Sequence, residues 1–446
     1  MTTILGPGTV LDWSGQVDAS PSRGVAWEGD RIVGVGALNA LEARYPGAEL
    51  IDARGGLIVP GFVNLHHHFY SALARGLDPG SPPRGFGDVL ESLWWRLDRS
   101  LDLDAVRLAA RLTLADCIRW GCTTVFDHHA SPRCIDGSLD ALAAEVESAG
   151  LSAVLCYEAS DRNGPEEALA GVAENADFCA RHLDHPSVRG VMGLHASFTV
   201  SDATLAETAQ QRPAGVGIHL HLCEDPLDIR VSNALYGAGP LDRLEASGLL
   251  DERAVLAHGV HLDPPELDRI AAAGAVLVHN PESNANNGVG RLDLVAAWRA
   301  GCRVALGSDG MGSSMLAALR FAFLSHRAAL RDPRVGFEAH PRLLASTADA
   351  ASSFLDEPLL GTIAPGAPAD LAVVEAPAPT PIDGTNLFGH LVYGAAGAAV
   401  RHTVSRGRVL MRDFELRTID LQETAAQARE AAARVWKRFY AIPPSV

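Results

Sequence analysis

The chain has 446 residues, of which 47% are hydrophobic and 20% charged, and its formal net charge is −17. This length allows one large domain and a smaller one. The acidic balance argues against nucleic acid or anionic membrane as partners, because both need basic patches. We find no apolar run near the roughly 18 residues of a membrane span, and we expect no signal peptide. Seven cysteines without a Cys-x-x-Cys pair suggest reduced thiols and a cytoplasmic protein.

Both ends of the chain show short strands and turns. Residues 1–58 include an alternating apolar pattern with a turn at Gly29-Asp30, and a β pattern returns over residues 360–418. We expect these two segments to form one small β-sandwich domain built from both termini. Residues 419–446 are rich in Ala, Glu and Arg with a period of about 3.6 residues, which predicts a C-terminal amphipathic helix.

The middle of the chain alternates between apolar runs typical of strands and amphipathic stretches typical of helices. The eight apolar runs cover residues 57–63, 123–126, 153–157, 188–194, 216–221, 254–257, 275–278 and 303–306. The helical stretches include residues 89–118, 139–148, 165–182, 241–246, 265–273 and 315–330. Buried strands that alternate with helices eight times are typical of a covered parallel sheet. We therefore predict an α/β fold, a (β/α)8 TIM barrel, over residues 59–359.

Polar residues follow almost every apolar run. They are His66, His68, Asp127, His128, His129, Glu158, His195, His219, His221, Glu224, His258, His279, Asn280 and Asp309. In such a barrel the active site lies at the carboxyl ends of the strands. An unpaired buried polar group costs about 1–3 kcal/mol, so this number of them indicates a functional site. The roles of Asp127, His129, Glu158 and His279 stay open, and hydrogen-bonded core positions explain His129 and His279 equally well.

The strongest single feature is His66-x-His68, which follows the first apolar run. In a strand the side-chain period is two, so these two imidazoles project to the same side and His67 to the other. Neutral imidazoles are ligands for zinc, iron, nickel and copper. The pair alone is a weak signal, and the further histidines and carboxylates at the other strand ends make it strong.

The sequence resembles the amidohydrolase superfamily, in its mononuclear branch of cytosine/guanine deaminase-like and chlorohydrolase-like enzymes. The matching motifs are Pro60-Gly-Phe-Val-Asn-x-His66-x-His68, His221-x-x-Glu224, Ala257-His258, Asn280-Pro-x-Ser-Asn284, Leu306-Gly-Ser-Asp309-Gly and Gly361-Thr-Ile-Ala-Pro-Gly-x-x-Ala-Asp370-Leu. Three further stretches resemble the aminohydrolase associated with selenium metabolism: Leu93-Trp-Trp-Arg-Leu-Asp98, Asp127-His-His-Ala-Ser-Pro132 and Asp161-Arg-Asn-Gly164. One difference is Ala367, where the superfamily commonly has lysine, and this position belongs to the expected β domain.

The resemblance implies one divalent metal ion, most simply zinc, with iron as the alternative. The implied ligands are His66, His68, His221 and Asp309. Glu224 would transfer protons, His258 would hold and polarise the attacking water, and Asp309 would also accept a proton from it. Binuclear relatives use a carboxylated lysine to bridge two ions. Lys437 is the only lysine and lies in the expected C-terminal helix, so we expect a single metal.

Other side chains near the same strand ends are candidates for substrate contacts. His195 resembles a position that often touches the substrate, and Tyr70, Trp95, His128 and Arg162 lie near the motifs. Aromatic and imidazole rings can stack on and hydrogen-bond to a flat ring. Core packing explains the aromatic residues equally well.

Together these features predict a hydrolase that deaminates a small amino-substituted nitrogen heterocycle and releases ammonia. An oxidised purine, a pterin or a triazine-like ring would fit. The alternatives are a chlorohydrolase or a cyclic-amide hydrolase on the same scaffold, and a catalytically inactive scaffold protein. The chain lacks the Pro-Cys-x-x-Cys of zinc nucleotide deaminases, His-Glu-x-x-His and a P-loop lysine. We expect a small-molecule substrate, no nucleic acid and no membrane, and a homo-oligomer is compatible with the sequence.

Overall fold

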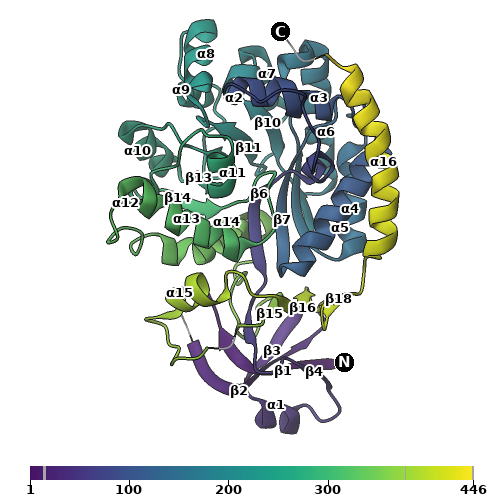
Figure 1. Ribbon diagram of the computed structural model, residues 1–446, viewed down its shortest axis with the longest axis vertical. Helices are drawn as coiled ribbons and strands as arrows, with labels where there is room; N and C mark the ends of the chain where they lie inside the picture. Colours follow the sequence, from purple (N-terminus) through teal and green to yellow (C-terminus); the bar gives the residue numbers. More distant parts are fainter. Residues whose placement is uncertain (14–16, 377, 444–446) are drawn as a thin grey trace.

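Parallel strands close into a barrel in the computed structural model, which describes residues 1–13, 17–376 and 378–443 (Figure 1). The strand segments are β6 (Phe62–His67), β7 (Cys122–His129), β8 (Ser152–Tyr157), β9 (Val188–Gly190), β10 (Met192–Ala196), β11 (Ile218–Leu222), β12 (Ala254–His258), β13 (Val276–His279) and β14 (Arg303–Leu306). Because β9 and β10 are separated only by Val191, these segments form eight barrel strands. The predicted fold is confirmed.

The barrel closes through backbone contacts between its first and last strands. His67 pairs in parallel with Asp309, and the Asp309 backbone N–H donates to the His66 carbonyl at 2.9 Å. At the other seam, Ala159 pairs in parallel with Leu194 and joins β8 to β10. Closure therefore places the end of β6 beside the residues that follow β14. These two segments are more than 230 residues apart in the sequence.

The first apolar run contributes to two sheets rather than one. Residues Leu57–Pro60 form β5 in the small sheet, and β6 begins at Phe62 in the barrel. Gly61 lies between them, where a Cβ atom would come within 2.2 Å of Thr123 Oγ1. Only glycine allows this close approach, so the chain can cross from the small sheet into the barrel. The expected single strand over residues 57–63 is therefore wrong.

Helices cover the outside of the barrel. They are α4 (Leu103–Arg119), α5 (Ser138–Ala149), α6 (Pro165–Arg181), α7 (Asp202–Gln211), α8 (Pro226–Tyr236), α9 (Pro240–Ala246), α10 (Pro264–Ala273), α11 (Pro281–Asn286), α12 (Leu294–Arg299), α13 (Met315–Leu330) and α14 (Leu343–Leu355). Each expected helical stretch contains at least one of these helices.

The stretch 89–118 is divided into several pieces. It forms α2 (Phe86–Val89), a π-helical turn η2 (Leu90–Trp94), α3 (Trp95–Asp98) and, after a break, α4. Asp102 ends the break by accepting a hydrogen bond from the Ala105 backbone N–H at 2.9 Å, which is an N-cap that starts α4. The short pieces before this cap can cross the end of the barrel instead of packing along its side.

Both ends of the chain form the small sheet. Its strands are β1 (Thr2–Leu11), β2 (Val17–Glu28), β3 (Arg31–Ala37), β4 (Glu49–Asp52), β5, β15 (Leu371–Val374), β16 (Val400–Ser405), β17 (Arg408–Arg412) and β18 (Glu415–Leu416), with α1 (Leu38–Arg44) between β3 and β4. The order is β18-β17-β16-β15-β5-β1-β2-β3, with β4 beside β1. The predicted pairing of the two termini is confirmed.

The expected sandwich is one continuous sheet that curls on itself. The Ile32 backbone N–H donates to the Ala367 carbonyl at 2.9 Å, and Trp27 Nε1 donates to the Gly407 carbonyl at 3.0 Å. These bonds bring the two ends of the sheet together around a separate apolar core that includes Trp27 and Leu371. Ala367, the position where the superfamily commonly has lysine, lies in this core, as expected for the β domain. The exact domain limits 1–58, 59–359, 360–418 and 419–446 stay predictions.

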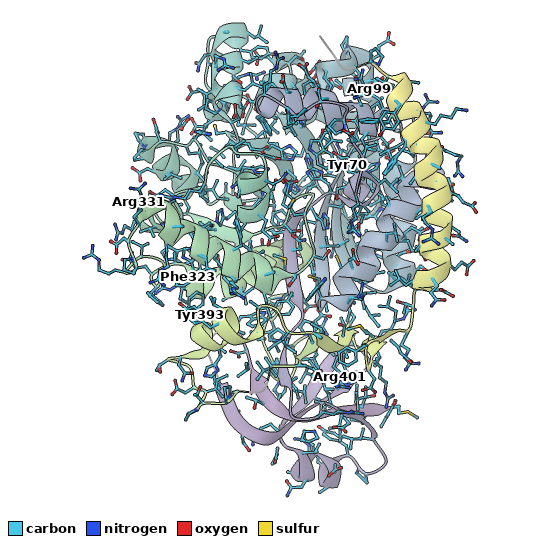
Figure 2. All side chains as sticks on the ribbon, viewed as in Figure 1. Tyr70, Arg99, Phe323, Arg331, Tyr393 and Arg401 are labelled. Carbon is cyan, nitrogen blue, oxygen red and sulfur yellow. The ribbon has the colours of Figure 1, made fainter. Side chains whose placement is uncertain are left out.

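Aromatic packing joins the barrel to the segment that follows β15. Phe323 of α13 contacts Phe388 of α15 (Leu387–Gly389) and Tyr393 of η6 (His390–Ala395), with ring centroids 5.2 and 6.3 Å apart. Figure 2 shows Phe323 and Tyr393 near the small sheet, whereas Tyr70 lies well inside the barrel. The site at the strand ends is thus separated from the small sheet by the length of the barrel.

All seven cysteines are free thiols, as expected, and six of them are buried. Among the described residues, we find no helix with both the length and the apolar character that a membrane crossing requires.

The C-terminal helix α16 (Leu421–Ala441) runs along the side of the barrel beside α4 (Figure 1). Its last turns hold α3: the Arg96 guanidinium donates to the carbonyls of Phe439 and Ile442 and lies 4.0 Å from the centre of the Phe439 ring. The predicted helix is confirmed for residues 421–441, and residues 444–446 lie outside the described part of the chain. The end of the chain therefore supports the segment that crosses the barrel.

We expect Phe439→Ala to lower the free energy of unfolding by about 3–5 kcal/mol, because the buried ring leaves a cavity against α3. The matched control is Tyr440→Ala, since the neighbouring Tyr440 ring is 54% exposed and should cost about 1 kcal/mol or less. Urea denaturation of both variants measures the difference. Equal losses in the two variants would contradict the packing role of Phe439.

Candidate metal centre and active site

The structure brings the predicted metal ligands together at the carboxyl ends of β6, β11 and β14. His68 Nε2 lies 3.0 Å from Asp309 Oδ1, and His66 Nε2 lies 3.7 Å from the same oxygen. His221 Nε2 lies 3.3 Å from His68 Nε2. All four side chains are at least largely buried. Side chains from three strands thus point at one small volume.

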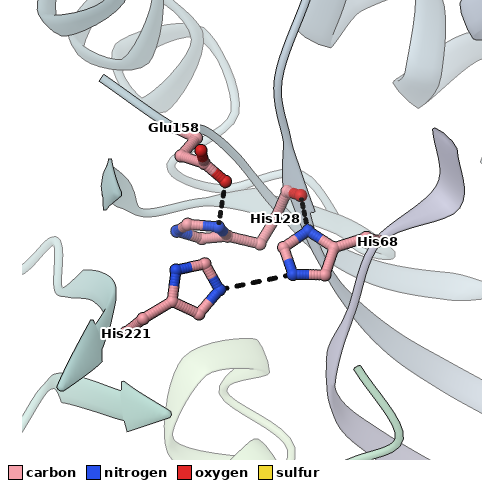
Figure 3. A group of neighbouring side chains, drawn as sticks. All are labelled: His68, His128, Glu158 and His221. Atoms are coloured by element: carbon pink, nitrogen blue, oxygen red, sulfur yellow. Dashed lines mark hydrogen bonds and ion pairs between the residues drawn. The ribbon is translucent and has the colours of Figure 1, made fainter. Parts of the chain in front are cut away.

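Hydrogen bonds to the outer ring nitrogens orient two of these imidazoles. His68 Nδ1 lies 2.5 Å from the His128 carbonyl (Figure 3). His221 Nδ1 lies 2.9 Å from the His195 carbonyl. A carbonyl oxygen only accepts, so each Nδ1 carries the hydrogen. In the neutral rings both Nε2 atoms therefore present lone pairs to the shared volume, as in many metal sites where the other ring nitrogen is held by a carbonyl.

This arrangement fits a cation. Two Nε2 lone pairs 3.3 Å apart repel each other unless a proton or a metal ion lies between them. His66 Nε2 is also buried and has no hydrogen-bond partner within the described residues. Burial lowers the pKa of His68, but the hydrogen bond and charge of Asp309 raise it to about 9 overall. The cluster thus attracts positive charge, and its nitrogen and carboxylate donors suit a divalent transition metal.

A second group of side chains lies next to this cluster. His258 Nε2 is 3.5 Å from Glu224 Oε2 and 3.8 Å from Asp309 Oδ2, and it is buried without a hydrogen-bond partner in the described chain. Asn284 Oδ1 lies 2.8 Å from His258 Nδ1 and favours a hydrogen on that atom. Burial and the charge of Asp309 raise the pKa of Glu224 to about 7. Glu224 can therefore hold a proton near neutral pH.

Backbone strain is concentrated at the same strand ends. Cys223, His258 and Asp309 have φ angles of 49°, 76° and 55°, in the left-handed region that non-glycine residues seldom adopt. Such residues cluster at functional sites because the surrounding structure holds them in place. The strain here turns the chain sharply at the ends of β11, β12 and β14, and the turn at Cys223 brings the next side chain, Glu224, beside His258.

A cavity opens directly above the cluster. Its walls are His68, Tyr70, Phe86, Leu90, Trp94, Trp95, Glu158, Arg162, His195, His221, Glu224, Ser283, Asn286, Asn287, Asp309, Gly310 and Met311. Phe86, Leu90, Trp94 and Trp95 come from the short helical pieces before α4. These apolar side chains roof the cavity, and the polar groups lie at its floor and sides.

Four of the five candidate substrate contacts line this cavity: Tyr70, Trp95, Arg162 and His195. The fifth, His128, does not. His128 is fully buried, and its Nε2 faces the carbonyls of Leu194 and His219 at 3.1 and 3.2 Å. Those oxygens accept its hydrogen, so His128 lies beneath the ligands and supports them rather than facing a substrate.

The rim residues whose roles the sequence left open have different positions. Asp127 Oδ1 accepts from the Phe69 backbone N–H at 2.6 Å, and His129 Nε2 lies 2.8 Å from Ser131 Oγ. His279 is buried away from the cavity. Glu158 is the exception, because it lines the cavity while its Oε2 lies 3.2 Å from His128 Nδ1 (Figure 3).

Sequence reasoning missed several polar residues of the site. The Ser283 hydroxyl donates to Asp309, and Asn287 Nδ2 donates to Glu224 Oε1 at 3.2 Å. His219, which the sequence placed at a strand end without a role, has its Nε2 2.9 Å from His66 Nδ1, beneath the metal cluster. The spacing His219-x-His221 indicated that both side chains project to the same side of the strand. The Asn287 contact depends on the turn after α11 and had no such signal.

Comparison with known proteins agrees with this geometry. The amidohydrolase family model matches residues 57–410. A 5-methylthioadenosine/S-adenosylhomocysteine deaminase from Haloarcula marismortui is 32% identical over 400 residues, which is 88% of this chain and 90% of the relative.

Two solved structures share the fold. One is a zinc-bound adenosine deaminase from Xanthomonas campestris, with a TM-score of 0.84, 23% identity and coverage of 97% of this chain and 98% of the other. The other is a zinc complex of atrazine chlorohydrolase from Arthrobacter aurescens, with a TM-score of 0.78, 24% identity and coverage of 96% and 100%. Each similarity extends over the barrel and the small sheet together.

The chain belongs to the amidohydrolase family. It is a hydrolase in the branch of deaminase-like and chlorohydrolase-like enzymes, as its motifs indicated, and it acts on C–N bonds other than peptide bonds.

We expect zinc to raise the unfolding temperature of protein that has been stripped of metal. A ligand at 100 times its Kd stabilises the native state by about 2.7 kcal/mol. His221→Ala should abolish this zinc-dependent shift, because it removes one of the converging nitrogens. The control His185→Ala changes a half-buried surface histidine paired with Glu147 and should keep the shift. Equal shifts in both variants would contradict the location of the metal centre.

Proposed function

We propose that the protein is a metal-dependent deaminase that hydrolyses the exocyclic C–N bond of a small amino-substituted nitrogen heterocycle and releases ammonia. The observation that carries this proposal is the position of Glu224. It lines the cavity, lies next to His258 and Asp309, and holds a proton near neutral pH. The deaminase named among the relatives above supports the same reaction.

We further propose that His66, His68, His221 and Asp309 hold one divalent cation, zinc in the first place and iron as the alternative. Three imidazole nitrogens and one carboxylate form a donor set that suits either metal. Lys437 lies on α16, outside the barrel strands, so no carboxylated lysine is available to bridge two ions. When bound, such a cation acts as a Lewis acid and lowers the pKa of a water molecule to about 7.

The chain's own residues then move protons. Asp309, which also accepts from Ser283, is placed to take a proton from the attacking water. His258 Nε2 is free to accept a hydrogen bond from the same water and to orient it. Glu224 gives its proton to a ring nitrogen of the substrate, which makes the neighbouring carbon more electrophilic. A C–O bond forms between the water oxygen and this carbon. Asp309 passes its proton to the amine, the C–N bond breaks and ammonia leaves, while the remaining hydroxyl proton returns to Glu224.

We expect the purified active protein to contain one tightly held metal ion per chain, most simply zinc. The donor atoms converge on one volume, and the residue that would bridge two ions is missing. Elemental analysis of the active protein measures the ratio. Two tightly held ions per chain, or none in active protein, would contradict the proposed centre.

We expect Glu224→Gln to keep the fold and the metal but to reduce kcat by about 10²–10⁴-fold, the usual range for general acid–base catalysis. Glutamine preserves the shape of the side chain and its contact with Asn287 but cannot carry the proton. Circular dichroism, metal content and the rate of ammonia release should be measured on the same sample. A rate within a few-fold of the native protein, with metal retained, would falsify the role.

We expect ammonia release from a neutral free base or pterin and none from the corresponding nucleotide. Of the cationic side chains near the strand ends, Arg162 is the one that lines the cavity, and Asp98 and Glu158 already lie beside it. A phosphate group would therefore find no free guanidinium. The screen should include guanine, 8-oxoguanine, pterin, ammeline and 5′-methylthioadenosine. If chloride release from a chlorinated ring or opening of a cyclic amide is much faster than any deamination, the deaminase assignment fails.

A further inference from the structure

Glu158, which follows β8, is a buried carboxylate that the proposed chemistry does not use. Its side chain is only 3% exposed, yet it lines the cavity. The positively charged guanidinium of Arg162 lies 3.5 Å from Glu158 Oε1 and favours the ionised form of this carboxyl group. Glu158 is therefore an anion in the wall of the site.

The two carboxylate oxygens of Glu158 have different surroundings. Oε2 lies 3.2 Å from His128 Nδ1, on the buried side of the cavity wall. Oε1 lies 3.5 Å from Arg162 Nη2 and 3.7 Å from His195 Nε2, which are both longer than ordinary hydrogen bonds. Oε1 thus keeps capacity to accept a hydrogen bond.

Arg162 does not supply that hydrogen bond because it is directed to another carboxylate. Its Nη2 lies 2.5 Å from Asp98 Oδ2, and both side chains are almost fully buried. The guanidinium also lies 5.5 Å from the centre of the Trp95 ring, which limits its movement. Asp98 therefore takes the shortest contact of Arg162 and leaves Glu158 with the weaker one.

His195 does not supply it either, because its hydrogen lies on the other ring nitrogen. Thr199 Oγ1 donates its own hydrogen to the Ala196 carbonyl at 3.1 Å and so accepts from His195 Nδ1 at 2.5 Å. His195 Nε2 is then a lone pair that faces Glu158 Oε1.

Two acceptors therefore face each other across 3.7 Å in the cavity wall with no donor between them. We infer that Glu158 and His195 together accept a hydrogen bond from the substrate, and that the substrate carries a ring N–H or a second amino group besides its leaving amine. This inference rests on the proposed deamination. Buried acceptors without a donor are costly, so they select strongly for a substrate that supplies one.

The donor is distinct from the leaving amine because of where the acid and base groups lie. Glu224, His258 and Asp309 form one close group, and Glu158 belongs to another with His68, His128 and His221. These two groups have no residue in common. A flat ring that places its amine at the first group presents a different edge to the second.

The test measures binding without turnover. Guanine, pterin and ammeline, each with its ring N-methyl derivatives, are titrated calorimetrically into the zinc-loaded Glu224→Gln protein. At least one N-methyl derivative of each compound that the native enzyme deaminates should bind 10-fold or more weakly than its parent. Adding Glu158→Gln should bring this ratio close to one, because the hydrogen bond to the charged carboxylate that distinguishes parent from derivative is lost.

A second variant tests His195 without altering Glu158. Thr199→Val removes the acceptor for His195 Nδ1 and favours a hydrogen on Nε2, which would occupy Glu158 Oε1. The ratio should again fall, and this variant carries the test if Glu158→Gln does not fold. The control Glu174→Gln changes another buried carboxylate, which accepts from the Gly137 and Leu139 backbone N–H groups on the outside of the barrel. Its ratio should not change.

The outcomes separate this inference from the proposed function. If the native enzyme releases ammonia from no compound of the screen above, the deaminase proposal fails and this inference fails with it. If it deaminates only 5′-methylthioadenosine, which has neither a ring N–H nor a second amino group, this inference is overturned while the deaminase stands. If deamination occurs but every N-methyl derivative binds within threefold of its parent, or if Glu158→Gln leaves the ratio unchanged, the paired acceptor is overturned while the deaminase stands.

Discussion

The repulsion between imidazole lone pairs that converge on one carboxylate is the constraint on which the rest of the site depends. His68 and His221 are held by carbonyl oxygens from neighbouring strands, so neither ring can turn its lone pair away. Asp309 completes the cluster only because barrel closure pairs the residue after β14 with β6. The cluster is thus built by the backbone of the barrel, and a cation relieves the repulsion that the backbone imposes.

The walls of the site depend on a different part of the chain. The short helical pieces before α4 place Phe86, Leu90 and the two adjacent tryptophans over the cavity. The Arg96 guanidinium connects these pieces to the last turns of α16. The C-terminal helix is therefore part of the architecture of the cavity, although it lies on the outside of the barrel. An apolar roof also excludes water, which strengthens the electrostatic contacts below it.

The polar residues at the floor of the cavity and those in its wall have different roles. Glu224, His258 and Asp309 form one group that can exchange protons with water and substrate. Glu158, with His128 beneath it and Arg162 beside it, forms a second group that exchanges no proton in the proposed reaction. The first group is placed to act on the reacting atoms of the substrate, and the second is placed to recognise another part of it. Because both groups lie at one cavity, a substrate has to contact both at once.

The sequence by itself determined the barrel, the pairing of the two termini and the ring of ligands. The periods of strands and helices can be read from short stretches of sequence. In such a barrel the active site lies at the carboxyl ends of the strands, so polar residues there mark its position. Only the tertiary structure decided which of these side chains face the cavity. His128 lies near the end of β7 and Glu158 directly follows β8, yet His128 turns to carbonyls beneath the ligands and Glu158 lines the wall. Likewise, the run at residues 57–63 is divided between two sheets because Gly61 packs against Thr123. A period of two shows which side chains share a side of a strand, but their depth and partners depend on neighbouring strands distant in sequence.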